Sequence, residues 1–224
     1  MNAWEYFCFL AAFLMIFWVS IVYAFYPKLQ LKNVEKLNLE NLGNGDLLFL
    51  SGGTFSEKVI KFYHKSFYSH VAFIFEDSRG VENPTKENTL FVWESDLGQN
   101  VKDGPRIMRL VDKLKRWKGD KIGMIRKYNG VRPTTIDIMN IAKLNLEKGM
   151  DASMISWFFS NYPDSYIFKF LKGDNMFCTE LVADTLQKLD IMESDRHPSS
   201  YTPNDLCRLV PKKGFYSFPI YFSL

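Results

Sequence analysis

Cysteine is scarce in this chain of 224 residues, which contains only Cys8, Cys178 and Cys207. Cys8 lies inside an apolar N-terminal run, so it is not expected to bridge to either of the others. A Cys178–Cys207 disulfide stays open, although free thiols in a reducing compartment are the simpler interpretation. No Cys/His pair has the spacing of metal ligands, so the sequence predicts no metal site.

Blocks of like charge, internal repeats and phosphate-binding glycine loops are missing as well. The formal net charge is only +3, and Lys and Glu are interspersed along most of the chain, which argues against a nucleic-acid partner. Gly43-x-Gly45 and Gly52-Gly53 lack the continuation of a P-loop or dinucleotide motif, and no cofactor is predicted. With 47% hydrophobic and 24% charged residues, the composition is that of a folded globular protein.

What the sequence does contain is an uncharged, apolar N-terminal run over residues 7–26. A run of about 20 apolar residues is long enough for a helix to cross a bilayer. A cleaved signal peptide would need basic residues before the run, where Glu5 stands instead. A buried core helix is a second alternative, but such helices are rarely so uniformly apolar. The run therefore predicts a single-pass transmembrane anchor, residues 1–26, with the lipid bilayer as a partner.

The flanks of this run predict its orientation. Lys28, Lys32 and Lys36 follow the run, and no basic residue precedes it. The positive-inside rule then places the rest of the protein on the cytoplasmic side. A polar tether over 27–41 is expected to lead into the main domain, 42–224.

The main domain combines a strand-rich middle with later helices, which predicts the α+β class with a mainly antiparallel sheet packed on helices. Strands are expected over residues 45–50, 69–75, 89–94, 107–110 and 122–126. Helices are expected over residues 54–65, 134–147, part of 151–172, and 178–189.

Cys178 is the candidate nucleophile. It lies where the Asp174-Asn175 turn leads into the last of these helices. Unpaired backbone N–H groups and the helix dipole favour a thiolate at such a position, and the same N–H groups can bind an oxyanion. A small buried cysteine that packs like alanine is an equally good interpretation of this motif alone.

His70 is the candidate general base, and Glu94 the candidate that orients it. His70 opens the strand 69–75, and Glu94 ends the next predicted strand, so antiparallel pairing brings them together. Asp96, two residues further on, would share the face of Glu94. His64 and His197 lie in a Lys-flanked helix and a Pro/Ser-rich loop and are interpreted as solvated, with His197 kept as a substitute base.

Five short segments of the chain resemble, in the same order, those of the circularly permuted papain-like hydrolases. This permuted branch of the NlpC-type amidases includes bacterial cysteine hydrolases and a poxvirus protein group, and is distantly similar to the lecithin:retinol acyltransferase family. The segments are Gly45-Asp46-Leu47-Leu48-Phe49, Ser69-His70-Val71-Ala72, Val92-Trp93-Glu94-Ser95, Phe177-Cys178-Thr179-Glu180-Leu181-Val182 and Tyr201-Thr202-Pro203-Asn204-Asp205-Leu206.

The resemblance covers roughly residues 42–209. It implies a papain-like fold with the Cys at a helix start, the His on a strand and a third polar residue on the next strand; permutation places the His before the Cys. The implied site is Cys178, His70 and Glu94. Residues 106–175 match no motif of the family, so the substrate pocket does not follow from the resemblance.

The function expected is therefore a cysteine hydrolase of the amidase or peptidase type, which cleaves an amide or ester bond through an acyl-enzyme. One rival keeps the site but acts on acyl-lipids or S-acylated proteins, as a phospholipase, acyltransferase or deacylase. The other rival is a scaffold or viral structural protein that retains the fold without turnover. The oligomeric state is not predicted.

Overall fold

The computed structural model describes residues 34–96, 103–120, 122–149, 176–208 and 216–224, together with 13–14, 17–21 and 24. Its centre is one sheet of seven strands in the order β1-β7-β6-β2-β3-β4-β5. All neighbours in the sheet are antiparallel except the parallel pair β1 and β7. The strands are β1 (Glu35–Lys36), β2 (Leu47–Leu50), β3 (His70–Glu76), β4 (Leu90–Asp96), β5 (Gly104–Arg109), β6 (Ile122–Arg126) and β7 (Ile220–Ser223).

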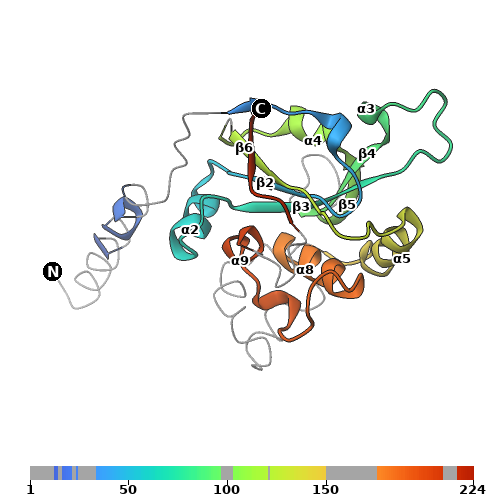
Figure 1. Ribbon diagram of the computed structural model, residues 1–224. Coiled ribbons are helices and arrows are strands. Elements are labelled where there is room, and N and C mark those ends of the chain that lie inside the picture. Colours follow the sequence, from blue (N-terminus) through green and yellow to red (C-terminus); the bar gives the residue numbers. More distant parts are fainter. Residues whose placement is uncertain are drawn as a thin grey trace.

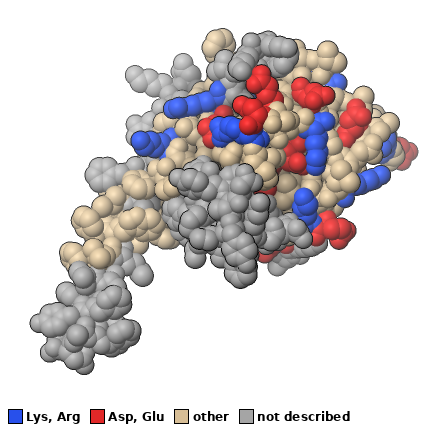
Figure 2. Space-filling view, turned by 90° about the horizontal axis from the view of Figure 1, so that it is seen from below, with Lys and Arg blue, Asp and Glu red and all other residues tan. Residues whose placement is uncertain are grey.

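Helices cover both faces of this sheet, and because the sheet is mainly antiparallel the protein is an α+β fold. Figure 1 shows α5, α8 and α9 on one side of the sheet and α4 on the other. The described helical elements are η1 (Leu39–Asn41), α2 (Phe55–Tyr63), α3 (Lys86–Thr89), α4 (Leu110–Arg116), α5 (Thr135–Asn145), α8 (Cys178–Lys188), η3 (Pro198–Ser200) and α9 (Pro203–Cys207). Seen from below, the described surface carries intermixed basic and acidic side chains (Figure 2).

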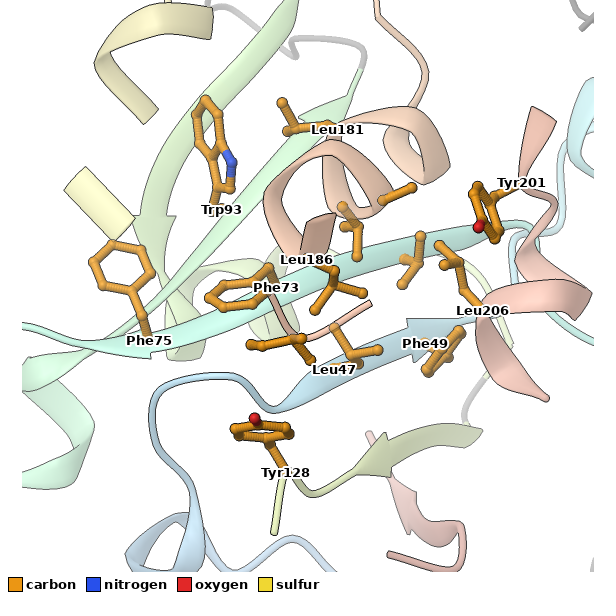
Figure 3. Packing of buried hydrophobic residues seen from close by; sticks show 14 of the residues in the cluster. Leu47, Phe49, Phe73, Phe75, Trp93, Tyr128, Leu181, Leu186, Tyr201 and Leu206 are labelled. Atoms are coloured by element: carbon orange, nitrogen blue, oxygen red, sulfur yellow. The ribbon is translucent and has the colours of Figure 1, made fainter. Parts of the chain in front are cut away.

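Alternation along the strands divides the interior into two cores, one on each face of the sheet. On β3, Phe73 and Phe75 belong to the core on the α8 side, whereas Ala72 and Ile74 belong to the core on the α4 side. This is the period of two that a strand imposes when both of its faces are buried. In Figure 3 the ring of Phe73 lies beside α8, close to Leu186. The two faces of the sheet therefore have separate neighbours, and the site described below draws on both.

Helix α8 is fixed on the sheet by its apolar face. Leu181, Val182 and Leu186 recur at helical spacing and are fully buried against the sheet. Full burial of each such side chain contributes about 1.5–3 kcal/mol. At the start of the helix, the carboxylate of Glu180 accepts a hydrogen bond of 3.4 Å from the backbone N–H of Phe177. This bond occupies the amide directly before Cys178 and sets where the helix begins.

The transmembrane anchor expected over 7–26, and with it the single-pass membrane protein, is a wrong prediction. A span needs about 20 consecutive apolar helical residues, and no helix among the described residues is long and apolar enough to cross a bilayer. Most of the run lies outside the described residues. Trp18, which is described, packs edge-on against Phe55 of α2 with ring centroids 6.2 Å apart.

Several element boundaries differ from the expected ones. The strand expected from Thr89 begins at Leu90, because Thr89 still closes the helix α3. The strand expected to end at Leu110 stops one residue earlier, and Leu110 opens α4. Strand β1 falls within the segment 27–41 interpreted as a tether, and the helix expected within 151–172 lies outside the described residues.

Candidate active site

The centre of the site is an ion pair between the first residue of β3 and a carboxylate on β4. Ile74 pairs with Val92, and the side chain of Glu94, two residues after Val92, points to the same face. His70 Nε2 donates a hydrogen bond of 2.8 Å to Glu94 Oε2. The side chains of both residues are buried, that of Glu94 completely. Burial of a carboxylate is costly unless charged donors surround it, so Glu94 requires partners besides His70.

Two further cations hold the Glu94 carboxylate. Arg106 lies directly opposite on β5 and binds Glu94 Oε1 through Nε at 3.0 Å and Nη2 at 2.9 Å. The Lys113 ammonium, from α4, lies 2.6 Å from Glu94 Oε2. Both cations also bind Asp96 Oδ2, Arg106 at 3.0 Å and Lys113 at 2.7 Å. Two carboxylates and two permanent cations thus form a balanced cluster beside His70.

An aromatic ring completes the surroundings of His70 on the α4 side. Trp117, the residue directly after α4, lies with its ring centroid 5.8 Å from that of His70 and tilted by 34°. The Lys113 ammonium lies 5.1 Å from the centroid of the same indole, within cation–π distance. Trp117 therefore covers His70 and holds Lys113 at the same time.

These contacts shift the titration of both members of the pair. Burial alone lowers the pKa of His70 and the Lys113 charge lowers it further, but Asp96, the Cys178 thiol and Glu94 outweigh both and raise the pKa to about 10. Burial alone raises the pKa of Glu94, but the hydrogen bond and charge of His70, with Lys113, hold it well below its usual range. At neutral pH the pair is therefore imidazolium and carboxylate.

Cys178 reaches this pair from the other face of the sheet. It is the first residue of α8 and partly exposed, and its sulfur lies 4.0 Å from the carbonyl oxygen of Ser69. Its thiol lies close enough to the His70 ring to contribute to the raised pKa of that histidine. Since Nε2 of that ring faces Glu94, Nδ1 is the nitrogen left for the sulfur. The structure thus brings together all three residues that the sequence singled out, Cys178, His70 and Glu94.

A buried lysine supports the segment that leads into His70. Ser69 Oγ accepts a 2.8 Å hydrogen bond from the backbone N–H of Gly52, in the loop after β2. Lys61 of α2 donates to Gly52 O and to Ser51 Oγ, both at 2.8 Å, and lies 3.3 Å from Asp120. Burial lowers the pKa of Lys61, and Asp120 opposes that shift. This network fixes the loop next to the start of β3.

The other candidate residues lie elsewhere or serve the fold. His197 is the N-cap of η3, with Nδ1 2.7 Å from Ser199 Oγ, and His64 ends α2 against the ring of Tyr63. Asp46 is fully buried and accepts backbone N–H groups of Gly43 and Tyr128, a structural role.

The two described cysteines, Cys178 and Cys207, are both free thiols. The disulfide between them that the sequence left open is therefore not formed in this structure. Cys8 lies outside the described residues.

Ligand atoms of His70, Glu94 and Asp96 lie within 4.8 Å of one another, close enough for a metal ion. The donor set fits such an ion poorly, because Lys113 and Arg106 already neutralise both carboxylates and occupy both oxygens of Glu94 and Oδ2 of Asp96. A divalent cation would have to displace two ammonium or guanidinium groups, one of them buried. The three residues therefore do not form a fitting metal site while both cations are in place.

Sequence reasoning missed Arg106, Lys113 and Trp117. The signal for Arg106 was the antiparallel register, since extension of the β4–β5 hairpin places it opposite Glu94. For Lys113 the signal was weaker. Glu94 and Asp96 share one face of a strand, and two carboxylates on a buried face require cations nearby. The helix that supplies Lys113 was not expected to begin at Leu110.

Comparisons with known proteins add little to this geometry. No protein-family model matches the chain, and no curated protein matches it. Among solved structures, the metalloprotein yiiX of Escherichia coli O157:H7, assigned to DUF1105, is similar with a TM-score of 0.46 and 20% identity over 68% of each chain. A likeness at that level supports no argument about the fold, the metal content or the activity of this chain.

Proposed function

We propose that this protein is a cysteine hydrolase that cleaves an amide or ester bond, with Cys178 as nucleophile, His70 as acid and base, and Glu94 as the group that orients His70. One observation carries the proposal: His70 binds the Glu94 carboxylate at 2.8 Å, and the Cys178 sulfur at the start of α8 lies 4.0 Å from the carbonyl oxygen of Ser69, the residue directly before His70. Nucleophile, base and orienting group in this order are the arrangement that activates a thiol.

The charges around His70 favour its protonated form. Arg106 and Lys113 balance Glu94 and Asp96, so a proton on His70 leaves one positive charge in excess. That excess favours the negative charge that the sulfur and the oxyanion carry during the reaction. The N-terminus of α8 lies on the same side, and the helix dipole favours negative charge there.

In the first step the Cys178 sulfur attacks the carbonyl carbon, and its electron pair forms the C–S bond while the carbonyl oxygen becomes an oxyanion. Backbone N–H groups at the start of α8 are the donors available to that oxygen. His70 then gives its proton to the leaving nitrogen or oxygen as the old bond breaks. The products of this step are a free amine or alcohol and a thioester on Cys178.

In the second step neutral His70 removes a proton from water, whose oxygen attacks the thioester carbonyl. Collapse of the intermediate breaks the C–S bond, releases the carboxylic acid and returns the proton and charge to the Cys178–His70 pair. Throughout, Glu94 accepts the Nε2–H and keeps Nδ1 directed at the sulfur.

The direct test is labelling of the whole protein with iodoacetamide-alkyne at a concentration that modifies only activated thiols. We expect Cys178→Ala to lose the label and Cys207→Ala, which removes the other described free thiol, to keep it. His70→Ala should reduce the labelling rate strongly, because the proposed base that activates the thiol is lost. Equal labelling of Cys178→Ala and the wild type would overturn the assignment.

Trapping the acyl-enzyme identifies the type of bond that the protein cleaves. The protein is incubated separately with a peptide amide, 4-nitrophenyl acetate, phospholipid vesicles and an S-palmitoylated peptide, and the mass added at Cys178 is measured. An adduct from the amide or simple ester supports the proposal. An adduct from the lipid or S-acyl peptide alone would move the function to acyl-lipid or S-acyl chemistry. No adduct from any of them would favour a scaffold without turnover.

A further inference from the structure

The oxygen of Glu94 that binds His70 has a second donor. Glu94 Oε2 accepts His70 Nε2–H at 2.8 Å and lies 2.6 Å from the Lys113 ammonium. Arg106, in contrast, binds the other oxygen, Oε1. The two cations are therefore not equivalent: Lys113 competes directly with His70 for one acceptor atom, whereas Arg106 does not.

Lys113 is held at that oxygen by three further features. Its side chain is only 4% exposed, its ammonium bonds Asp96 at 2.7 Å, and it lies over the Trp117 indole. A lysine has many rotamers when free, so this degree of confinement fixes a charge that an exposed lysine would leave mobile. Lys115, two residues later on the same helix, is exposed.

We propose that Lys113 is a positioning residue for His70: by sharing Glu94 Oε2, it limits how strongly Glu94 holds the imidazolium and thereby keeps His70 able to release its proton. The inference rests on the proposed cysteine hydrolase function. It concerns the second step above all, in which His70 must be neutral to take a proton from water.

Several charged or aromatic groups set the proton affinity of His70, and they come from four elements. They are Glu94 and Asp96 of β4, Arg106 of β5, Lys113 of α4 with Trp117 directly after that helix, and Cys178 of α8. The carboxylates favour the proton on His70, whereas the positive charge of Lys113 opposes it. Removal of the Lys113 charge has two effects on His70. It ends the repulsion between the two cations, and it leaves Glu94 Oε2 to His70 alone. Both effects raise the pKa of His70.

The experiment follows the His70 ring by NMR in protein labelled at its histidines. The chain has only three of them, and a His70→Gln sample identifies the signal. At pH 10 the wild-type ring should be about half protonated, since its pKa is raised to about 10. Lys113→Met should remain protonated at that pH, and Lys115→Met, the matched control, should titrate like the wild type. Lys113→Arg, which keeps the charge, should restore most of the wild-type midpoint.

A kinetic readout separates this role from a structural one. With 4-nitrophenyl acetate, Lys113→Met should keep its initial burst of 4-nitrophenolate but turn over more slowly. The loss should be about tenfold for each pH unit by which the His70 midpoint rises, because the neutral fraction of His70 falls in that ratio.

Circular dichroism establishes that each variant folds. Lys113→Gln, which keeps a hydrogen bond without the charge, replaces the methionine variant if that one does not fold. An unchanged or lowered His70 midpoint in the folded variant would overturn the inference. The NMR result does not depend on turnover. Failure of the hydrolase proposal would instead be seen as unchanged labelling of Cys178→Ala, so the two failures can be told apart.

Discussion

Ser95 Oγ donates a hydrogen bond of 2.7 Å to the carbonyl oxygen of Met176, two residues before Cys178. Ser95 follows Glu94 on β4, so adjacent residues of one strand serve the two halves of the site. Trp93 and Ser95 face α8, and Trp93 Nε1 donates to Thr185 Oγ1 at 3.1 Å. Glu94 and Asp96 face α4 and its cations. A single strand thus positions the nucleophile helix with its odd residues and the acid–base pair with its even ones.

Ser95→Ala should therefore weaken the attachment of the segment that leads into α8. Ser95 is fully buried and Met176 nearly so, and loss of the hydroxyl leaves the Met176 carbonyl without this donor. We expect a loss of about 1–3 kcal/mol in the free energy of unfolding and slower alkylation of Cys178. Urea titration and the iodoacetamide rate measure the two effects. The exposed Ser78→Ala is the control, and a Ser95→Ala protein as stable as this control would contradict the prediction.

The second attachment of α8 is tested at Thr185. This buried hydroxyl accepts from Trp93 and donates to the Leu181 carbonyl at 2.7 Å. Thr185→Val keeps the volume but leaves the indole N–H without an acceptor, which should cost about 1–3 kcal/mol. Thr185→Ser keeps the hydroxyl and loses one methyl group, about 0.8 kcal/mol. Urea unfolding should rank the valine variant as the less stable of the two; the reverse order would show that packing outweighs the hydrogen bond.

The pH dependence of stability follows from His70. Its pKa is raised from 6.5 to about 10 on folding, so its contribution is fully present below pH 6.5 and is lost as the pH rises through about 10. Each pKa unit is worth about 1.4 kcal/mol, which makes an effect on the order of a few kcal/mol. The advantage of the wild type over His70→Gln in unfolding free energy should thus be larger at pH 6 than at pH 10.5. An equal advantage at both pH values would mean that His70 folds without a bound proton.

The neighbourhood of His70 and Glu94 was accessible to sequence reasoning because it depends on local patterns. A histidine that opens one strand and a glutamate that ends the next meet when the strands pair antiparallel, whatever the rest of the chain does. Cys178 was likewise predicted at a helix start, because Leu181, Val182 and Leu186 repeat at helical spacing after a polar turn.

The cations and the edge strands depend on long-range placement, which periodicity does not encode. Lys113 reaches Glu94 only because α4 begins at Leu110 and packs back on the sheet, where a strand end was expected. Strand β1 pairs with β7, so residues far apart in the sequence become neighbours in the sheet. No local sequence motif predicts this pairing. The apolar run at 7–26 shows the converse error, in which composition alone predicted a membrane span.

One such long-range contact is testable at Gly123. This glycine of β6 lies opposite the buried Phe222 of β7, and a Cβ atom there would come within 2.4 Å of the ring. Gly123→Ala should push the ring out of place and cost about 1–3 kcal/mol. Gly53→Ala is the matched control, because nothing lies within 4 Å of the added atom. Thermal unfolding should show a lowered midpoint for the first variant alone; a Gly123→Ala protein as stable as Gly53→Ala would contradict the close approach.

The cation cluster leads to a last prediction, about metal binding. Lys113 and Arg106 occupy both oxygens of Glu94 and Oδ2 of Asp96, three of the four carboxylate oxygens open to a metal ion at His70, Glu94 and Asp96. In a Cys178→Ala background, which removes the nearby thiol, Zn²⁺ added in a calorimeter should therefore give little heat, and EDTA should leave the unfolding temperature unchanged.

Arg106→Gln combined with Lys113→Gln frees the three ligands and leaves two carboxylates uncompensated, so this double variant should gain Zn²⁺ affinity over its parent. The gain is the positive control that makes the weak binding of the parent meaningful. Stoichiometric Zn²⁺ binding by the parent, or a fall in its unfolding temperature with EDTA, would show that a metal displaces Lys113. The pair of cations would then be a resting state of a metal site rather than the permanent partners of Glu94.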